Sequence, residues 1–241
     1  MATAYKVATR AGDLTVHAFE PPPAGDLGLT VITVHPWAPL GGGEHNTVGI
    51  AEHLSRHGLR GITFQLRSSF MVWGVLSNHR SEVAQIEAVV NWAHEKFGCT
   101  LLLGSSAGAP MAGSALDRGP AVGLACIGYT WGWLSSVALG RHYGRVRRSA
   151  KPKLFLQGER DEFTAPELLH STARRMDDCE KCIFKGVGHF DLEHSSWDAE
   201  VVRVIRAWVG ERFLDEGSAP RDEAGQLVCM DAAEHAARGR A

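Results

Sequence analysis

The sequence predicts an α/β protein with a mostly parallel central sheet of about eight strands and helices on both faces. Three observations support this prediction. Apolar and β-branched runs alternate along the chain with longer amphipathic segments. The run LTVITV at 29–34 is continuous, as in strands that are buried on both faces. Residues 81–97 repeat apolar side chains at helical spacing, and Gly98 then supplies a stop signal.

The expected elements follow one another in the order that a parallel sheet requires. Two short strands around the turn at 11–13 open the chain as an antiparallel edge, and three prolines at 21–23 stop the second strand. Gly58 supplies the stop signal of the first helix. We expect strands at 5–10, 14–19, 29–34, 62–66, 99–103, 121–127, 153–157 and 181–184, and helices at 46–57, 81–97, 107–116, 166–176 and 196–213.

Two further stretches define the extent of the domain. The stretch between the strands at 121–127 and 153–157 is too short for a large lid, so we expect a minimal cap domain or none. Residues 215–241 are rich in alanine, glycine and charged side chains and contain few core-forming residues. We therefore expect one domain over 1–214 and a flexible or loosely docked C-terminal tail over 215–241.

Composition and charge exclude several classes of protein. The 241 residues are 44% apolar and 22% charged, which is ordinary for a soluble globular protein. The formal net charge is −2 without a basic stripe, so nucleic acid is not an expected partner. The first residues lack the apolar segment of a signal peptide, and no apolar run approaches the ~18 residues of a transmembrane helix. We expect a cytoplasmic protein, and its oligomeric state is open.

The five cysteines indicate structural roles rather than redox or metal chemistry. Cys99 and Cys126 lie in apolar, strand-like runs, where a free thiol behaves as a small hydrophobic side chain. Cys179 and Cys182 form a C-x-x-C pair, which fits a redox pair or half of a zinc site. However, no second such pair and no histidine pair stands at metal-binding spacing in the sequence. We expect no metal site, and the odd number of cysteines argues against a disulfide framework.

The sequence GSSAG at 104–108 directly follows the predicted strand at 99–103, and small residues come after it. This is the pattern of a nucleophile elbow, in which a strand, a sharp turn and a helix hold a serine at a strained corner. The two glycines are needed where a Cβ would collide with a neighbouring strand or helix. The pattern predicts that Ser106 is a nucleophile. The alternative is a Gly/Ser-rich loop after a buried strand.

A serine nucleophile needs a base within hydrogen-bond reach, and that base needs an acid to orient it. In an open parallel sheet these groups come from loops at the carboxyl ends of strands. Asp161 follows the strand at 153–157 and a glycine, and His189 follows the strand at 181–184 and a glycine-rich turn. The joint pattern predicts a triad of Ser106, Asp161 and His189. Alone, Asp161 also fits a surface turn, and His189 is one of twelve histidines.

The tetrahedral intermediate of such a reaction needs two main-chain N–H groups aimed at its oxyanion. One is expected from Ala107, the residue after the nucleophile. The other is expected from the loop after the strand at 29–34. Because Pro36 and Pro39 have no N–H, Trp37 is the expected donor of that loop. The alternative is a proline- and glycine-rich turn without a catalytic part.

Together these segments resemble those of compact α/β-hydrolases of the dienelactone-hydrolase type, whose first loop reads His-Pro-x-x-x-x-Gly-Gly. The matching residues are His35-Pro36 to Gly41-Gly42, Gly104 to Gly108, Gly158 with Asp161, and Gly188-His189-Phe190. The resemblance covers about residues 5–213. It implies the α/β-hydrolase fold, a Ser106 nucleophile with an Asp161 acid and a His189 base, and no metal or organic cofactor.

One loop departs from the pattern of this family. Relatives often carry Arg-Gly-x-Gly-x-Ser after the fourth strand, where this chain has RSSFMVWG at 67–74. This loop borders the expected site. The substrates of the family are therefore not transferred to this chain.

Aromatic side chains gather on the loops that are expected to face the site, which favours an apolar acyl or alcohol group. The residues expected to line the substrate pocket are His35, Phe70, Trp73, Tyr129, Trp131 and Trp133. Alternatively, some of the tryptophans seal the edge of the core. The arginines at 141–148 fit an anionic substrate, but a solvated basic face is the simpler interpretation.

The sequence thus predicts a serine esterase or thioesterase that cleaves small to medium acyl esters through an acyl-enzyme intermediate. Its expected partner is a small-molecule ester or thioester. A peptidase or a lipase with the same triad stays open. The alternative from another class is a non-catalytic binding or scaffold protein, which the altered loop at 67–74 and the charged tail favour.

Overall fold

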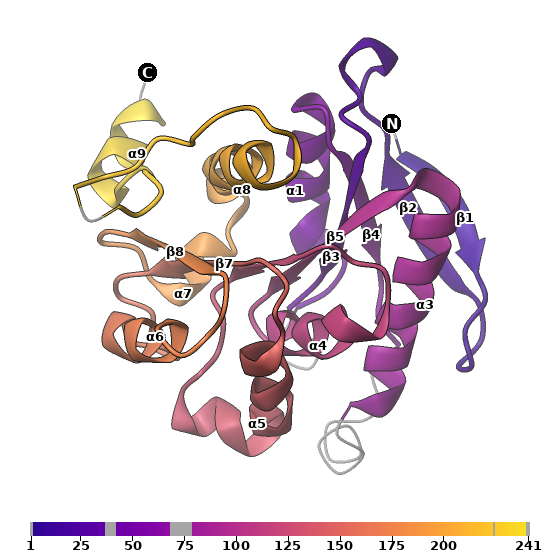
Figure 1. Ribbon diagram of the computed structural model, residues 1–241, viewed down its shortest axis with the longest axis horizontal. Helices are drawn as coiled ribbons and strands as arrows, with labels where there is room; N and C mark the ends of the chain where they lie inside the picture. Colours follow the sequence, from indigo (N-terminus) through magenta and orange to yellow (C-terminus); the bar gives the residue numbers. More distant parts are fainter. Residues whose placement is uncertain (1, 37–41, 68–78, 224, 240–241) are drawn as a thin grey trace.

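The computed structural model describes residues 2–36, 42–67, 79–223 and 225–239, and only the backbone of 133–138, 140 and 141. Its centre is one eight-stranded sheet with the order β1-β2-β4-β3-β5-β6-β7-β8 (Figure 1). β2 runs antiparallel to β1 and β4, and every later pair is parallel. The prediction of a mostly parallel α/β fold with an antiparallel edge is confirmed.

The strands differ from their expected bounds by two or three residues at β1, β4, β5, β6 and β8. The strands are β1 (Ala2–Val7), β2 (Leu14–Phe19), β3 (Leu29–Val34), β4 (Arg60–Phe64), β5 (Cys99–Ser105), β6 (Leu124–Ile127), β7 (Lys153–Gly158) and β8 (Cys179–Phe184). β1 begins early because Ala2 pairs with Phe19 in the antiparallel register. β8 begins at Cys179 because this residue pairs with Lys153 of β7.

The helices include three that the sequence pattern does not predict. The α-helices are α1 (His45–Arg56), α3 (Arg80–Phe97), α4 (Gly108–Ala115), α5 (Trp133–Arg148), α6 (Pro166–Ala173), α7 (His189–Leu192), α8 (Asp198–Phe213) and α9 (Ala232–Arg238). Helix α5 contains interior glycines, which weaken its helical pattern. Helix α7 is a single turn, and α9 lies in the segment expected to be a tail. No helix in the described ranges has both the length and the apolar composition of a membrane span.

Helices cover both faces of the sheet and enclose two separate cores. Helices α1 and α8 lie on one face, and α3, α4 and α5 lie on the other (Figure 1). Alternate side chains of each strand point to opposite faces. Leu102 of β5 therefore joins the core under α3 and α4, whereas Leu101 and Leu103 join the core under α1 and α8. Both faces are apolar, which explains why the central strands read as continuous hydrophobic runs.

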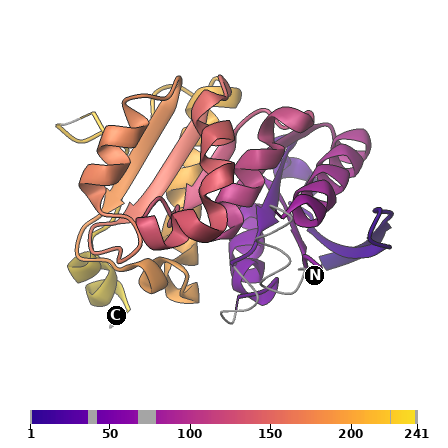
Figure 2. The ribbon, with the colours of Figure 1, turned by 90° about the horizontal axis from the view of Figure 1, so that it is seen from below.

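The parallel strands bring distant parts of the chain to one edge of the sheet. The antiparallel β1–β2 hairpin lies at one end of the molecule, and β7 and β8 lie toward the other end (Figure 2). Between them, β3, β5, β6, β7 and β8 all run in the same direction. The loops that follow these strands therefore meet at the same edge, where open α/β sheets place their ligands.

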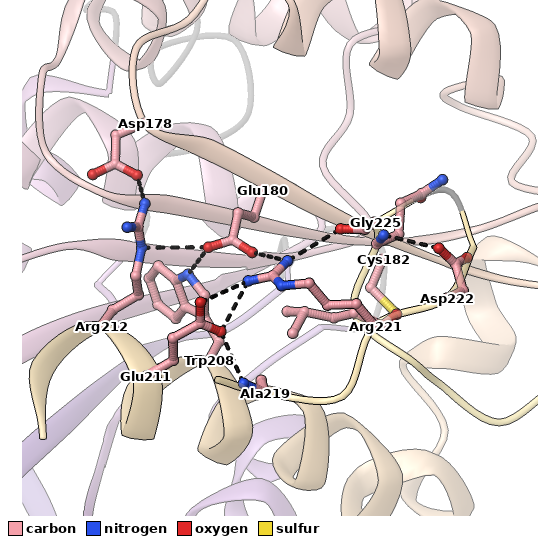
Figure 3. Close-up of polar contacts among 12 residues, drawn as sticks. Asp178, Glu180, Cys182, Trp208, Glu211, Arg212, Ala219, Arg221, Asp222 and Gly225 are labelled. Atoms are coloured by element: carbon pink, nitrogen blue, oxygen red, sulfur yellow. Dashed lines mark hydrogen bonds and ion pairs between the residues drawn. The ribbon is translucent and has the colours of Figure 1, made fainter. Parts of the chain in front are cut away.

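The C-terminal segment packs on the domain over its described part, 215–223 and 225–239. Ala219 and Leu227 belong to the core under α8. The Arg221 guanidinium bonds Glu180 of β8 at 2.8 Å and Glu211 of α8 at 2.9 Å (Figure 3). The sequence predicts a flexible or loosely docked tail because its core-forming residues are few. In the structure these few residues and several polar contacts join it to α8 and β8: Arg221 binds Glu180 and Glu211, Arg206 binds Glu216, and Arg203 donates to Val228 O.

The same segment also covers an edge strand. β8 is the last strand of the sheet, so one side of its backbone has no partner strand. The Cys229 thiol donates to Ile183 O at 3.3 Å, and Ala232 N–H donates to Lys185 O at 3.0 Å. These contacts shield part of the open edge. The predicted domain boundary after residue 214 stays a prediction.

The two cysteines of the C-x-x-C pair lie on opposite faces of β8. Cys179 packs against the core under α3, and Cys182 is buried in the core under α8. Their odd spacing in a strand separates them in this way, since side chains alternate. All five cysteines are free. In the described part of the chain, no group of three or more His, Cys, Asp or Glu side chains is arranged to hold a metal ion.

We expect Leu227→Ala to destabilise the protein, because the Leu227 side chain is only 3% exposed and lies in the core under α8. Loss of a buried leucine typically costs about 2 to 4 kcal/mol of unfolding free energy. Val228→Ala is the matched control, because Val228 is 42% exposed and its truncation should change stability by less than about 0.5 kcal/mol. Urea unfolding followed by circular dichroism measures both. Equal stabilities would show that the segment does not dock.

Candidate active site

The corner between β5 and α4 holds Ser106 in an unusual main-chain conformation. Its φ is +51°, in the left-handed region that non-glycine residues rarely adopt. The Ser106 N–H donates to Ile127 O of the neighbouring β6 at 2.8 Å, and Ser106 O accepts from Ala109 N–H at 3.0 Å. Ser105 before it is buried, whereas Ser106 is partly exposed. The corner therefore presents Ser106 and not Ser105, as the elbow pattern predicts.

The two glycines of the pattern are required by close packing. A Cβ on Gly104 would lie 2.4 Å from the Cα of Ala109, and a Cβ on Gly108 would lie 2.4 Å from both Val34 O and His35 O. Real side chains do not approach backbone atoms this closely. Residues larger than glycine at these positions would push α4 away from β5 and β3.

The structure brings Ser106, His189 and Asp161 into one hydrogen-bonded row. Ser106 Oγ lies 2.8 Å from His189 Nε2, and His189 Nδ1 lies 2.6 Å from Asp161 Oδ2. The side chains of His189 and Asp161 have no exposed surface. With the Nδ1 proton donated to the carboxylate, Nε2 is left to accept the proton of the Ser106 hydroxyl.

The Asp161 carboxylate is fixed by the loop that follows it. Its Oδ1 accepts the main-chain N–H groups of Phe163 and Thr164, both at 2.8 Å. Its Oδ2 is left for the imidazole of His189. The turn after β7 therefore fixes the direction of this carboxylate.

His189 begins α7 and packs tightly on the loop after β6. A Cβ on Gly128 would lie 2.9 Å from the ring carbon Cε1 of His189, and Gly128 has a φ of +57°. Only glycine satisfies both conditions without strain. On its other side the ring meets Phe163 edge-to-face, with the centroids 4.6 Å apart. The ring is therefore held from two sides.

Glu193 is a functional candidate that the sequence analysis missed. Its Oε1 lies 3.4 Å from His189 Nε2, the nitrogen that faces Ser106. Burial alone lowers the pKa of His189, but the carboxylates of Asp161 and Glu193 outweigh it and raise the pKa to about 9. The spacing of four residues between His189 and Glu193 is the signal that could have found it, because such residues are neighbours on a helix.

His35 is enclosed by main-chain partners, and its predicted place in the substrate pocket stays a prediction. Its side chain is buried, and Nε2 accepts the Leu66 N–H at 3.0 Å. The proton therefore sits on Nδ1, which donates to Pro36 O at 2.6 Å. Burial lowers the pKa of His35, in keeping with a neutral ring. His35 thus joins the loop after β3 to the loop after β4.

Tyr129 and Trp131 pack in the core, and their predicted places in the substrate pocket stay predictions. Tyr129 is completely buried and Trp131 is 8% exposed, and their rings stack with centroids 4.2 Å apart. The aromatic side chains beside the base are instead Phe163 and Phe190, whose rings meet edge-to-face at 5.8 Å. Phe190 is 63% exposed. Phe163 lies two residues after Asp161, and Phe190 directly follows His189. The sequence pattern does not show which way either ring points.

The remaining predicted site residues fall in three groups. Ala107 lies at the start of α4, where main-chain N–H groups have no partner within the helix. For Trp133 the structure gives only the backbone, at the start of α5. Trp37, Phe70 and Trp73 lie outside the described residues. Their predicted roles, and the oxyanion roles of Trp37 and Ala107, stay predictions.

The same architecture occurs in solved structures. A serine hydrolase without a lid from Xanthomonas campestris superposes with a TM-score of 0.69 and 21% identity, over 86% of this chain and 94% of the other. A serine hydrolase homologue from Coxiella burnetii superposes with a TM-score of 0.68 and 19% identity, over 88% of this chain and 97% of the other. An esterase domain from Rhodothermus marinus superposes with a TM-score of 0.67 and 14% identity, over 88% of this chain and 98% of the other. No family model matches the chain, and no curated protein matches its sequence.

The chain has the α/β-hydrolase fold. The matched structures are covered almost over their full length, so the likeness extends over the whole sheet and its helices. The predicted fold class is thereby confirmed. In this fold the nucleophile, the acid and the base follow strands in the chain order Ser, Asp or Glu, His. Ser106 follows β5, Asp161 follows β7 and His189 follows β8, which is the same order, and their catalytic roles stay predictions.

We expect Gly128→Ala to slow the reaction of Ser106 with a fluorophosphonate, a probe for activated serines. The new Cβ would push the His189 ring away from Ser106, and a misplacement of about 1 Å can cost about 100-fold in rate. Gly28→Ala is the matched control, because Gly28 also has a positive φ, +72°, but no atom within 4 Å of the new Cβ. Equal labelling rates for both variants would contradict the proposed contact.

Proposed function

We propose that this protein is a serine hydrolase that cleaves small to medium acyl esters or thioesters through an acyl-enzyme intermediate. The observation that supports this most strongly is the hydrogen-bonded row Ser106–His189–Asp161 at the carboxyl edge of the sheet. A serine becomes a nucleophile when a neighbouring imidazole takes its proton. Structural likeness supports the fold, and the reaction is inferred from the site.

Acylation begins with Ser106. Its Oγ–H bond breaks as Oγ bonds the substrate carbonyl carbon, and the proton passes to His189 Nε2. The electron pair of the carbonyl moves to oxygen, where the N–H groups of Ala107 and Trp37 are the proposed donors. The intermediate then collapses. His189 gives its proton to the leaving alkoxide or thiolate, and the acyl group stays on Ser106.

Deacylation repeats these steps with water. His189 takes a proton from the attacking water, and the returning proton restores the Ser106 hydroxyl when the acid leaves. Asp161 accepts the Nδ1–H of His189 throughout and stabilises the imidazolium that forms twice in each cycle. None of these proposed steps draws on a metal or an organic cofactor.

The substrate class follows from the surroundings of the base. The Phe163 and Phe190 rings lie against His189 and give this side of the site an apolar character. Apolar walls favour acyl or alcohol groups over charged ones. Ester substrates agree with the names of structural neighbours such as the Rhodothermus marinus esterase domain. The predicted cytoplasmic location and the predicted lack of nucleic-acid partners stay predictions.

We expect Ser106→Ala to abolish hydrolysis of p-nitrophenyl esters and acyl thioesters of graded chain length. Removal of the nucleophile of a triad typically lowers the rate by about 10⁴-fold or more. Fluorophosphonate should label the wild type and not Ser106→Ala. Ser171→Ala is the control, because Ser171 is an exposed serine on α6.

Two results would contradict the proposal. Equal turnover by Ser106→Ala and the wild type would exclude Ser106 as nucleophile. Wild-type protein that neither turns over any ester or thioester nor reacts with fluorophosphonate would instead support the non-catalytic binding protein.

A further inference from the structure

Glu193 places a second carboxylate beside the catalytic base, on the side opposite to Asp161. It follows α7 and lies one helical turn after His189. Its Oε1 is 3.4 Å from His189 Nε2, and only 12% of its side chain is exposed. This oxygen is inaccessible to solvent and has no hydrogen-bond partner among the described residues. A buried carboxylate oxygen without a donor is costly, so this arrangement requires an explanation.

The protonation state of His189 decides whether this contact is favourable. In the neutral ring, Nε2 carries a lone pair and accepts from Ser106, so Nε2 and the Glu193 oxygen face each other as two acceptors. In the protonated ring, Nε2 carries a hydrogen, and the carboxylate then faces both a donor and a positive charge. The geometry therefore favours the imidazolium over the neutral imidazole.

We propose that Glu193 is a positioning residue for the general base, which stabilises the protonated form of His189 and thereby shifts hydrolysis toward alkaline pH. This inference rests on the proposed function, since it concerns the base of that reaction. Glu193 contacts neither the nucleophile nor the acid in the hydrogen bonds of the described residues. It acts through the ring of His189.

Other charged groups near His189 do not take this role. Asp161 binds the opposite ring nitrogen, Nδ1. Glu162 accepts the main-chain N–H of His189 at 3.2 Å and so meets the backbone instead of the ring. Asp191 accepts the N–H of Gly188. The charged groups that raise the pKa of His189 most strongly are the carboxylates of Asp161 and Glu193.

The direction of the effect on activity follows from the role of the base. His189 must be neutral to take the Ser106 proton, so activity rises with pH as the ring loses its proton. Asp161 and Glu193 together raise the pKa of His189 to about 9, against the lowering effect of burial. Both carboxylates therefore favour the protonated base, and the neutral base becomes more populated as the pH rises.

Glu193 also has a favourable effect on the chemical step. When the Ser106 proton passes to Nε2, the ring becomes an imidazolium, which a nearby carboxylate stabilises. Above the pKa of His189, loss of this carboxylate should therefore lower the plateau of kcat/KM. Below that pKa, the same loss should raise kcat/KM, because more of the base is neutral. The two pH profiles should cross.

The test compares full-length wild type, Glu193→Gln and Glu193→Asp. Glu167→Gln is the control, because Glu167 is an exposed carboxylate on α6. The first measurement is the titration of the His189 ring by NMR, with its signal among the twelve histidines assigned from its absence in His189→Gln. The second is the pH profile of kcat/KM on a p-nitrophenyl ester.

We expect the pKa of His189 to be lower in Glu193→Gln than in the wild type by about one pH unit or more. A charged group this close typically shifts the pKa of its partner by about 1 to 3. The acid limb of the kcat/KM profile should move to lower pH by the same amount. The pKa of His189 in Glu193→Asp should lie between those of the wild type and Glu193→Gln. An unchanged pKa of His189 in folded Glu193→Gln would overturn the proposal. A loss of activity at all pH values without a shift of the acid limb of kcat/KM would also overturn it. The NMR result does not depend on turnover, so failure of the proposed function is seen separately.

Discussion

Ser106 adopts a φ of +51°, a left-handed conformation that costs a non-glycine residue about 1–2 kcal/mol. Its N–H is held by Ile127 O of β6, and the turn closes so tightly that positions 104 and 108 have no room for a Cβ. The next helix must then approach the sheet closely, which explains why all residues of α4 are buried and most are small. The strained corner, the small helix and the glycines are thus one constraint, and the surrounding core stabilises it.

The acid and the base are positioned by contacts that reach back to the same corner. Tyr129 and Trp131 anchor the loop after β6 in the core, and Thr164 joins that loop to the loop of the acid. The Thr164 hydroxyl donates to Tyr129 O and accepts from Trp131 N–H, while its own N–H donates to Asp161 Oδ1. Buried aromatic side chains therefore contribute to the site through the backbone that they fix.

This difference shows how far the sequence could predict the site. Position after a strand is a local property, so the order Ser106, Asp161, His189 and the strands that precede them could be predicted from pattern alone. The direction of a loop side chain depends on packing from elsewhere, and for that reason the burial of His35, Tyr129 and Trp131 could not be predicted. Helix α5 was missed because glycines interrupt its helical pattern. The contacts of the C-terminal segment could not be predicted, because its two or three core-forming residues are too few to make a recognisable pattern.

Comparison of three buried histidines shows which effect dominates at the base. His35, His142 and His189 have at most 1% of their surface exposed. Burial lowers the pKa of His35, and burial with nearby His79 and arginines lowers the pKa of His142 to about 4. His189 alone of the three has its pKa raised, to about 9, and it alone has carboxylates at both ring nitrogens. Desolvation is comparable at all three sites, so the carboxylates decide the charge of the ring. A fold that buries its base this deeply keeps it able to accept a proton only because Asp161 and Glu193 are buried with it.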